Sequence, residues 1–276
     1  MDLLQQPKRA EKGLIRERVG WRKRVNAWRK RSPLSPYWIE LMWLWKAAEW
    51  LAPQARGRLL DVGCGERPYE DLFDAHVTGY VGLEYPPVAD NLHPEIWGKL
   101  AQLHGVVDVF GDGQRMPFKD AAFDTVLALE MLEHVAHPDA CVREFARVLA
   151  PGGTLLLTVP LFAPLHQWPF DFYRYTPKGI EALLGRHGFV IQHVLPRGNF
   201  ASTTGAMLSH WIARSFGADR VQHDGTVSLS RWRAPFVLPL VAGAQLFFKA
   251  CERLSKDQGA SLGYAVVARL ASAGQG

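Results

Sequence analysis

One carboxylate and two glycines form the first group of residues whose types and spacing suit the binding of a ligand. In Asp61-Val-Gly-Cys-Gly65, a short apolar run ends at the Gly63-Cys64-Gly65 turn. The run has no helical spacing, which predicts a buried parallel strand that enters a tight turn. Glycine lets a ligand approach the main chain, and the carboxylate of Asp61 offers acceptors to that ligand. The segment therefore predicts a cofactor site.

The residue three positions after Gly65 narrows the class of cofactor. A dinucleotide fingerprint has a third glycine where the helix begins, so that the pyrophosphate lies on the helix N-terminus. Pro68 occupies that position here. The sequence therefore favours a cofactor without phosphates. Glu84 closes the next predicted strand 23 residues after Asp61, near the spacing at which an acidic side chain binds both ribose hydroxyls.

A further carboxylate follows the third predicted strand, at residues 106–110. Asp112 is followed by Gly113 and Gln114 in a loop at the end of that strand. An aspartate there can accept a hydrogen bond from the exocyclic amine of adenine, while neighbouring backbone amides bind the ring nitrogens. We therefore expect residues 112–114 at the base of a nucleoside.

These residues carry a family resemblance. The stretch Arg58–Pro68 resembles the first motif of the class I S-adenosylmethionine (SAM) dependent methyltransferases, and Arg147-Val-Leu-Ala-Pro-Gly-Gly-Thr154 resembles a late motif. Four such motifs occur in order across residues 58–159, in the manner of type 11-like members that act on small molecules or in envelope pathways. The resemblance implies SAM as the cofactor. The residues expected to bind it are Asp61, Gly63, Cys64, Gly65, Glu84, Asp112, Gly113, Gln114 and Glu130.

A loop rich in polar and aromatic residues, 164–176, follows the fifth predicted strand. His166 is the leading candidate for a general base, because the unperturbed pKa of histidine lies near working pH. Asp171 is expected to orient His166 or to balance its charge. The alternatives are an ordinary loop histidine, and an aspartate that caps the next helix or pairs with a nearby arginine. The residues expected to contact the acceptor are Trp168, Tyr173 and Arg174; the alternative for Tyr173 and Arg174 is to close over the carboxylate of SAM.

The segment Glu130-Met-Leu-Glu-His134 offers a rival base and an alternative metal site. It resembles the segment of ubiquinone-pathway O-methyltransferases in which two acids and the following histidine are associated with a divalent cation. Carboxylate and imidazole ligands suit such an ion. The same pattern recurs in family members with no metal, in which the first glutamate lies by the cofactor. We expect no metal, with Glu130, Glu133 and His134 as the alternative site.

The order of elements predicts an α/β fold with a Rossmann-like, seven-stranded class I methyltransferase sheet. Residues 1–52 are predicted to form basic and tryptophan-rich N-terminal helices, and residues 53–195 the SAM-binding α/β core. A helical insertion over residues 196–260 separates the last two strands as a substrate cap. Residues 261–276 are the last core strand and a tail.

The insertion is unusual for its length, because in the family the last two strands form a hairpin. Inserted segments of this size are usually functional. It holds two predicted helices, near residues 201–216 and 234–254. Residues 234–248 carry no charge. This run is too short to span a bilayer, but it suits a buried cap helix or an interfacial segment.

Charge is distributed unevenly along the 276 residues. The net charge is +5, and residues 1–31 hold eleven Lys or Arg against three acids, which leaves about −3 for the remainder. Residues 8–31 fit a basic amphipathic helix, which could contact an anionic membrane or remain a solvated arm. A mildly acidic body argues against nucleic acid as the main substrate.

Other sequence features bear on the compartment. Three scattered cysteines give no disulfide framework, and no secretory signal or 18-residue uncharged apolar run is present. We expect a cytoplasmic protein, with membrane association through residues 8–31 as an open alternative. No pattern predicts an oligomeric state.

Together these features predict a SAM-dependent methyltransferase that acts by in-line transfer with a histidine base. The expected acceptor is a hydroxyl of a small molecule, or of a lipid- or sugar-linked compound. N- or C-methylation of a secondary metabolite remains open, as does a non-catalytic SAM-binding scaffold.

Overall fold

The computed structural model describes residues 32–86, 106–221, 227–254, 257 and 259–271. The predicted amphipathic helix over residues 8–31, and the membrane contact expected from it, lie outside these residues.

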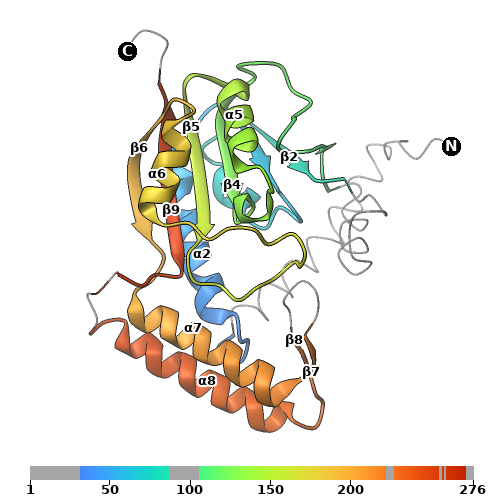
Figure 1. Cartoon of the computed structure of the whole chain (residues 1–276), viewed down its shortest axis with the longest axis vertical. Coiled ribbons are helices and arrows are strands. Elements are labelled where there is room, and N and C mark those ends of the chain that lie inside the picture. The colour runs from blue at the N-terminus through green and yellow to red at the C-terminus, as the bar shows by residue number, and fades with distance from the viewer. Residues whose placement is uncertain (1–31, 87–105, 222–226, 255–256, 258, 272–276) are drawn as a thin grey trace, which may run out of the picture.

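A seven-stranded sheet with strand order β3-β2-β1-β4-β5-β9-β6 forms the centre of the molecule (Figure 1). The first five strands in this order are parallel, and β9 runs antiparallel to both β5 and β6. This confirms the predicted fold class. The strands are β1 Arg58–Val62, β2 Gly79–Glu84, β3 Val109–Phe110, β4 Phe123–Leu129, β5 Leu149–Pro160, β6 Phe189–Pro196 and β9 Gly263–Leu270.

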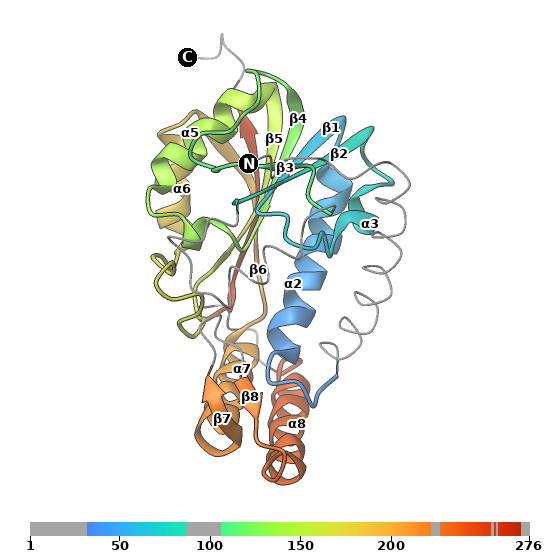
Figure 2. The same ribbon diagram turned by 90° about the vertical axis from the view of Figure 1, so that its right-hand side faces the viewer.

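Helices cover both faces of this sheet, which is why its central strands are apolar without alternation. Figure 2 shows α5 and α6 on one side and α2 and α3 on the other. Buried residues of α5 recur at the spacing of a helix face, as expected for a helix packed on a sheet. The helices are α2 Trp38–Leu51, α3 Glu70–Phe73, α5 Pro138–Val148 and α6 Pro177–Gly185, with 3-10 turns at Ala52–Gln54 and Leu132–His134.

A helical hairpin lies between β6 and β9, beyond the end of the sheet to which β5 points (Figure 1). The sequence predicts its two helices, but not the small strand pair between them, β7 and β8. These strands are too short for a periodicity of two to be recognised. The elements are α7 Phe200–Ile212, a π-helical turn Ala213–Gly217, β7 Ala218–Val221, β8 Val227–Leu229 and α8 Ala234–Cys251.

Helix α2 connects the hairpin to the sheet. Near its start, Ile39 packs with Ala206 of α7 and with Leu262. Near its end, Ala47 and Leu51 pack against residues of the central strands. The predicted division of the chain at residues 52, 195 and 260 stays a prediction, because α2 contributes to both packing clusters.

Candidate active site

Asp61 lies in β1 where that strand approaches the glycine turn. Its side chain is buried and accepts a hydrogen bond from the hydroxyl of Tyr80 on β2. Burial raises the pKa of Asp61 to about 7, and the Tyr80 hydrogen bond opposes this shift. A carboxylate that is costly to keep charged in the free protein gains from a cationic or hydrogen-bond-donating ligand.

The glycine turn has the conformation that the sequence predicts. Gly63 and Gly65 have φ of 74° and 50°, in the left-handed region. A Cβ atom at Gly63 would lie 2.8 Å from Cβ of Met131, so only glycine fits there. A Cβ atom at Gly65 would meet no atom within 4 Å. The turn therefore has open space in front of Gly65, where the sequence predicts the cofactor.

Glu84 at the end of β2 contacts this same turn. Its Oε2 accepts a hydrogen bond from the amide of Gly65 at 2.7 Å, and its Oε1 accepts one from the amide of Tyr85 at 2.9 Å. Burial raises the pKa of Glu84, while these two hydrogen bonds oppose the shift. The structure therefore brings the first and second predicted carboxylates to one turn, as the spacing in the sequence indicates.

The Asp112 loop lies against the same end of β1. A Cβ atom at Gly113 would lie 3.4 Å from Val62. The carboxylate of Asp112 accepts hydrogen bonds from the backbone amide of Gln114 at 2.8 Å and from its side-chain amide at 3.1 Å. The predicted adenine-binding residues thus neighbour the glycine turn, with Asp112 held by Gln114.

Cys64 differs from its neighbours, because its thiol faces inward. The side chain is buried, and burial raises its pKa. Its backbone amide, like that of Gly63, donates to the carbonyl of Leu83, at 3.1 and 2.9 Å respectively. Cys64 therefore helps to hold the turn on β2.

Sequence reasoning missed Arg67, which closes the turn. Its φ is 52°, and its guanidinium is buried. It forms ion pairs with Glu70 at 3.1 Å and with Asp108. The partner Asp108 comes from the segment before β3, so no local pattern in the sequence predicts this contact.

Glu130 follows β4 directly and has an unusual backbone for a non-glycine residue, with φ of 50°. Its amide donates to Oγ1 of Thr158 at 3.0 Å. Its Oε2 forms an ion pair of 3.0 Å with Nη2 of buried Arg197, which follows β6. Sequence reasoning also missed Arg197. Strained backbone of this kind gathers at functional sites, and the end of β4 is where the sequence places Glu130 beside the cofactor.

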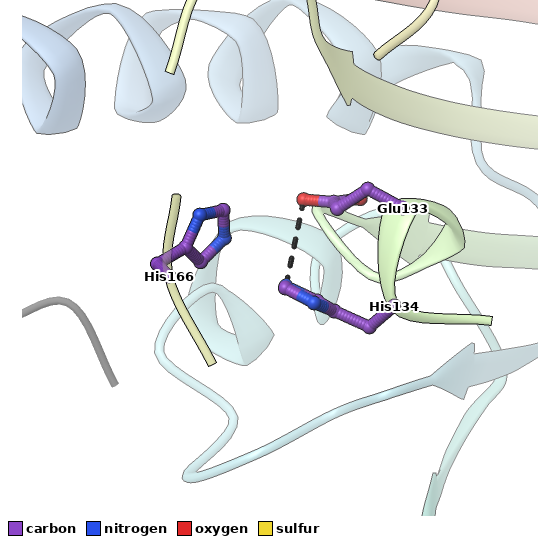
Figure 3. A group of neighbouring side chains, drawn as sticks. All are labelled: Glu133, His134 and His166. Carbon is purple, nitrogen blue, oxygen red and sulfur yellow. Dashed lines mark ion pairs between the residues drawn. The ribbon is translucent and has the colours of Figure 1, made fainter. Parts of the chain in front are cut away.

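Three side chains converge just beyond Glu130, as Figure 3 shows: Glu133, His134 and His166. Potential ligand atoms of all three lie within 4.8 Å of one another. Glu133 is fully buried, and neither of its carboxylate oxygens has a hydrogen-bond partner among the described residues. Burial raises the pKa of Glu133 well above its usual value, and the nearby charge of Glu130 adds to the shift.

The ring of His134 has a defined orientation. Its Nδ1 lies 2.7 Å from the carbonyl of Phe170. A carbonyl only accepts, so Nδ1 carries the proton and Nε2 holds the lone pair. Nε2 lies 3.8 Å from Oε1 of Glu133, beyond hydrogen-bond range. Burial, together with the neighbouring His166, lowers the pKa of His134 to about 4.

His166 stands edge-on to His134, with ring centroids 4.7 Å apart. Its Nδ1 donates to the carbonyl of Pro164 at 3.0 Å, and this leaves Nε2 as its acceptor nitrogen. The backbone amide of His166 donates to Asp171 Oδ2 at 3.0 Å, and Nδ1 lies 3.5 Å from the same oxygen. The predicted pair of His166 and Asp171 is therefore brought together.

Asp171 is in turn held by Arg174 through two contacts, of 2.5 and 2.8 Å. Burial would raise the pKa of Asp171, but the hydrogen bonds from Arg174 and from the His166 amide outweigh burial and lower it. The alternative of an Asp171–Arg174 pair is thus also present, together with the His166 contact. The three residues form one connected group.

The predicted acceptor-binding residues differ in their surroundings. The guanidinium of Arg174 is bound to Asp171 and also donates to the carbonyl of Ala163. The hydroxyl of Tyr173 donates to the carbonyl of Ala136 at 3.1 Å. Trp168 is 62% exposed. Only Trp168 presents most of its side chain to solvent.

An apolar groove lies beside this loop, away from the glycine turn. It has a volume of about 450 Å³ and runs along α7. Phe162, which follows β5 and precedes His166 by four residues, contributes to its wall. Sequence reasoning did not define this groove, because it depends on how α7 packs beside the loop. Its lining residues are Phe162, Phe200, Thr203, Thr204, Met207, Leu208, Trp211 and Ala260.

Comparison with known proteins decides the family. A family model described as a methyltransferase domain matches residues 39–194, more than half of the chain. The chain belongs to the class I SAM-dependent methyltransferases. The predicted family is therefore confirmed, and the cofactor of this family is S-adenosyl-L-methionine.

Two relatives of this methyltransferase differ in the atom that their names specify. The 27-O-demethylrifamycin SV methyltransferase of Amycolatopsis mediterranei is 32% identical over 138 residues, covering 50% of this chain and 47% of that protein. The ubiquinone/menaquinone biosynthesis C-methyltransferase of Roseobacter denitrificans is 33% identical over 153 residues, covering 51% and 60%. The matched region spans about half to three fifths of the length of these relatives.

A solved structure supports the fold. A chain of the complex between the Haloferax volcanii Trm112 methyltransferase activator and a methyltransferase has a TM-score of 0.50 and 19% identity. The match covers 83% of this methyltransferase and 89% of that chain. At this level of identity, the likeness concerns the fold alone.

Proposed function

We propose that this methyltransferase methylates a hydroxyl group of a hydrophobic small molecule or of a lipid- or sugar-linked acceptor. His166 acts as the general base. The observation that carries the proposal is the orientation of His166, whose Nδ1 is bound to a carbonyl and stands beside Asp171. This arrangement leaves Nε2 free to accept the proton of a hydroxyl.

One group of residues binds the cofactor, and a second group positions the acceptor. The carboxylates of Asp61, Glu84 and Asp112, together with the open space at Gly65, suit a nucleoside with a cationic amino-acid portion. When bound, SAM supplies an electrophilic methyl group. The residues after β4 and β5 then have to position the acceptor oxygen in line and remove its proton.

His166 suits the role of base better than His134 does. The pKa of His134 is lowered to about 4, so its lone pair is a poor proton acceptor at neutral pH. Asp171, whose pKa is lowered, supplies a negative charge beside His166. The carbonyl of Pro164 therefore orients the ring, while Asp171 holds the His166 backbone and stabilises the imidazolium that forms. His134 supports the loop through its bond to Phe170.

The groove on α7 supports a hydrophobic acceptor. Its wall includes Phe162, two residues before the loop at residues 164–176, and contains mainly apolar and aromatic side chains. An acceptor with its hydroxyl near His166 can place an apolar portion against Met207 and Trp211. The relatives are named for both O- and C-methylation, so the choice of oxygen rests on the histidine and not on similarity.

The test of the base is His166→Gln, assayed for transfer of labelled methyl from SAM to a panel of hydroxylated amphiphiles. We expect kcat to fall about a hundredfold or more, with the dissociation constant for SAM unchanged in calorimetry. His76→Gln, at an exposed position, is the matched control. Full activity in His166→Gln would remove His166 as the base, and methylated carbon or nitrogen in the product would remove the choice of oxygen.

A second candidate uses the same residues to hold a divalent cation. The buried oxygens of Glu133 and Nε2 of His134 lack hydrogen-bond partners among the described residues, and such groups favour an ion. The trio that gathers here is Glu133, His134 and His166, because Glu130 is bound to Arg197. The cation would hold the acceptor oxygen and lower its pKa.

Metal analysis separates the two candidates. If a cation acts here, the purified enzyme should contain about one equivalent, and Glu133→Gln should lose it together with activity. If His166 acts alone, chelation should leave activity unchanged, and Glu133→Gln should remain active. The two outcomes exclude one another.

A further inference from the structure

Helix α8 has its apolar residues on the side that faces solvent. Phe236 is 76% exposed, Leu240 61% and Phe247 63%. These positions are four and seven residues apart, which is one and two turns of a helix, so they form a single face. A helix in contact with water normally presents polar residues there. We call this surface the outer face of α8; its residues are Pro235, Phe236, Pro239, Leu240, Gly243, Leu246, Phe247 and Ala250.

The opposite face of α8 is held firmly by the protein. Val237 and Val241 are buried, and so is Gln245. The side-chain amide of Gln245 donates to the carbonyls of Pro33 at 2.8 Å and Ser35 at 2.7 Å. Its Oε1 accepts a hydrogen bond from the amide of Ile39 at 3.1 Å. These bonds tie the middle of α8 to the start of α2.

This anchoring decides how α8 can meet lipid. Among the described helices, α8 has the length and apolar composition of a membrane span, and only 17% of the helix is buried. Spanning a bilayer would break the three hydrogen bonds of Gln245 and leave its amide in hydrocarbon, at a high cost. The helix is therefore suited to lie along a bilayer surface and not to cross it.

Both ends of the outer face carry groups that suit a lipid interface. Before α8, Trp232 is 85% exposed between exposed Arg231 and Arg233. After α8, Arg253 and Leu254 are exposed. Tryptophan prefers the headgroup level of a bilayer, and arginine is attracted to anionic headgroups. The apolar stripe thus has cationic groups at each end.

The sequence of the whole hairpin agrees with this pattern. Residues 197–260 hold eight Lys or Arg and four Asp or Glu, a net charge of +4. Residues 1–31 add +8, so the rest of the chain is −7. A second copy paired antiparallel on the outer face would set the arginines at one end of α8 against those at the other. Like charges disfavour that pairing, whereas an anionic surface complements them.

We propose that the outer face of α8 docks this methyltransferase on the surface of an anionic lipid bilayer. Figure 2 shows that the α7–α8 hairpin projects beyond the sheet, so a bilayer can reach it without contacting the core. The residues that enter the lipid are Phe236, Leu240 and Phe247, and the flanking arginines bind the headgroups. This surface is separate from the groove on α7 and does not depend on the identity of the acceptor.

The test is cosedimentation of the full chain with vesicles of phosphatidylcholine, with and without about one third phosphatidylglycerol. We expect binding to the anionic vesicles, and a loss of at least tenfold in the double variant Phe236→Glu/Leu240→Glu. Both positions are exposed, so the variant should fold, which SAM binding checks. Val190→Glu, at an exposed position on β6, is the matched control and should bind as the wild type does.

Removing the arginines that precede α8 should also weaken binding to vesicles. Arg231→Gln/Arg233→Gln should weaken binding to the anionic vesicles by about fivefold for each arginine, with little change on neutral vesicles. Undiminished binding of Phe236→Glu/Leu240→Glu to the anionic vesicles would overturn the proposal. Failure of the wild type to cosediment with these vesicles would overturn it too. A wild-type dimer in light scattering that this variant dissociates would overturn it as well, and would assign the outer face to a second copy.

Discussion

The sheet and the α7–α8 hairpin place their apolar residues in opposite ways. In the sheet, Leu60, Val126 and Leu155 are fully buried between two layers of helices. In the hairpin, large apolar side chains of α8 and Trp211 of α7 face outward. Burial in the core contributes directly to stability, whereas an exposed apolar face contributes only when something covers it.

This difference matches the two tasks that we propose for the enzyme, which are cofactor binding and acceptor binding. The cofactor side has carboxylates and glycines held by backbone hydrogen bonds, as Gly65 is held by Glu84. The proposed acceptor side has a groove lined mainly by apolar residues, and it has the exposed apolar face of α8 nearby in the same hairpin. Family motifs concentrate on the first side, so the acceptor has to be inferred from the second. Three substitutions test whether the two sides are separable.

The largest expected effect is on the cofactor side. Gly65→Val should raise the dissociation constant for SAM a hundredfold or more, because the new side chain fills the open space in front of the turn. The left-handed φ adds a stability cost of about 1–2 kcal/mol. Calorimetry with SAM measures the first effect and thermal unfolding the second. Gly79→Val, where no atom lies within 4 Å of a Cβ, is the control; near-normal affinity in Gly65→Val would contradict the site.

A smaller effect is expected on the acceptor side. Met207→Glu introduces a charge into the apolar groove, and desolvating that charge opposes binding of an apolar ligand. We expect KM for the acceptor to rise about tenfold, while the affinity for SAM stays unchanged. Steady-state kinetics at saturating SAM provide the measurement. A parallel loss of SAM affinity would mean that the two sides are not independent.

The smallest effect concerns stability without cofactor. The pKa of Asp61 is about 7 in the folded enzyme and 3.8 in an ordinary aspartate. The folded state therefore binds this proton more tightly, and wild-type stability falls as pH rises from about 4 to 7. Asp61→Asn lacks that loss. Its free energy of unfolding should therefore be higher than that of the wild type by on the order of 1 kcal/mol at pH 8, and by less at pH 5.

Thermal unfolding at the two pH values measures this difference. Asp71→Asn, at an exposed position on α3, is the matched control. An Asp61→Asn enzyme that is less stable than the wild type at pH 8 would show that the carboxylate is favourable in the free protein. The buried, charged carboxylate of Asp61 would then not reduce the stability of the free protein.

The sequence predicts the parts of the site that depend on local spacing. Asp61, Gly65 and Glu84 meet because adjacent parallel strands end at one edge of a sheet. The loop at residues 164–176 is likewise predicted, since His166 and Asp171 are only five residues apart. In these cases the pairing partners are near in sequence or follow from sheet order.

Other contacts depend on distances that a sequence alone does not give. Arg197 pairs with Glu130 across 67 residues, and Arg67 with Asp108 across 41. Each pair requires knowing which loops lie side by side. The expected strand at residues 106–110 is reduced to Val109–Phe110, because only these two residues pair with β2. The sequence also does not predict that α8 is exposed, because an apolar helix is usually buried.

The way the hairpin joins the sheet has a further consequence. It leaves the sheet at Arg197 and returns at Leu262, and the backbones of these residues bond to each other, with Leu262 N–H donating to the Arg197 carbonyl at 3.0 Å. Entry and exit therefore share one point. The intervening segment can therefore be lengthened without altering strand register, provided that Gln245 keeps its hydrogen bonds to Pro33, Ser35 and Ile39.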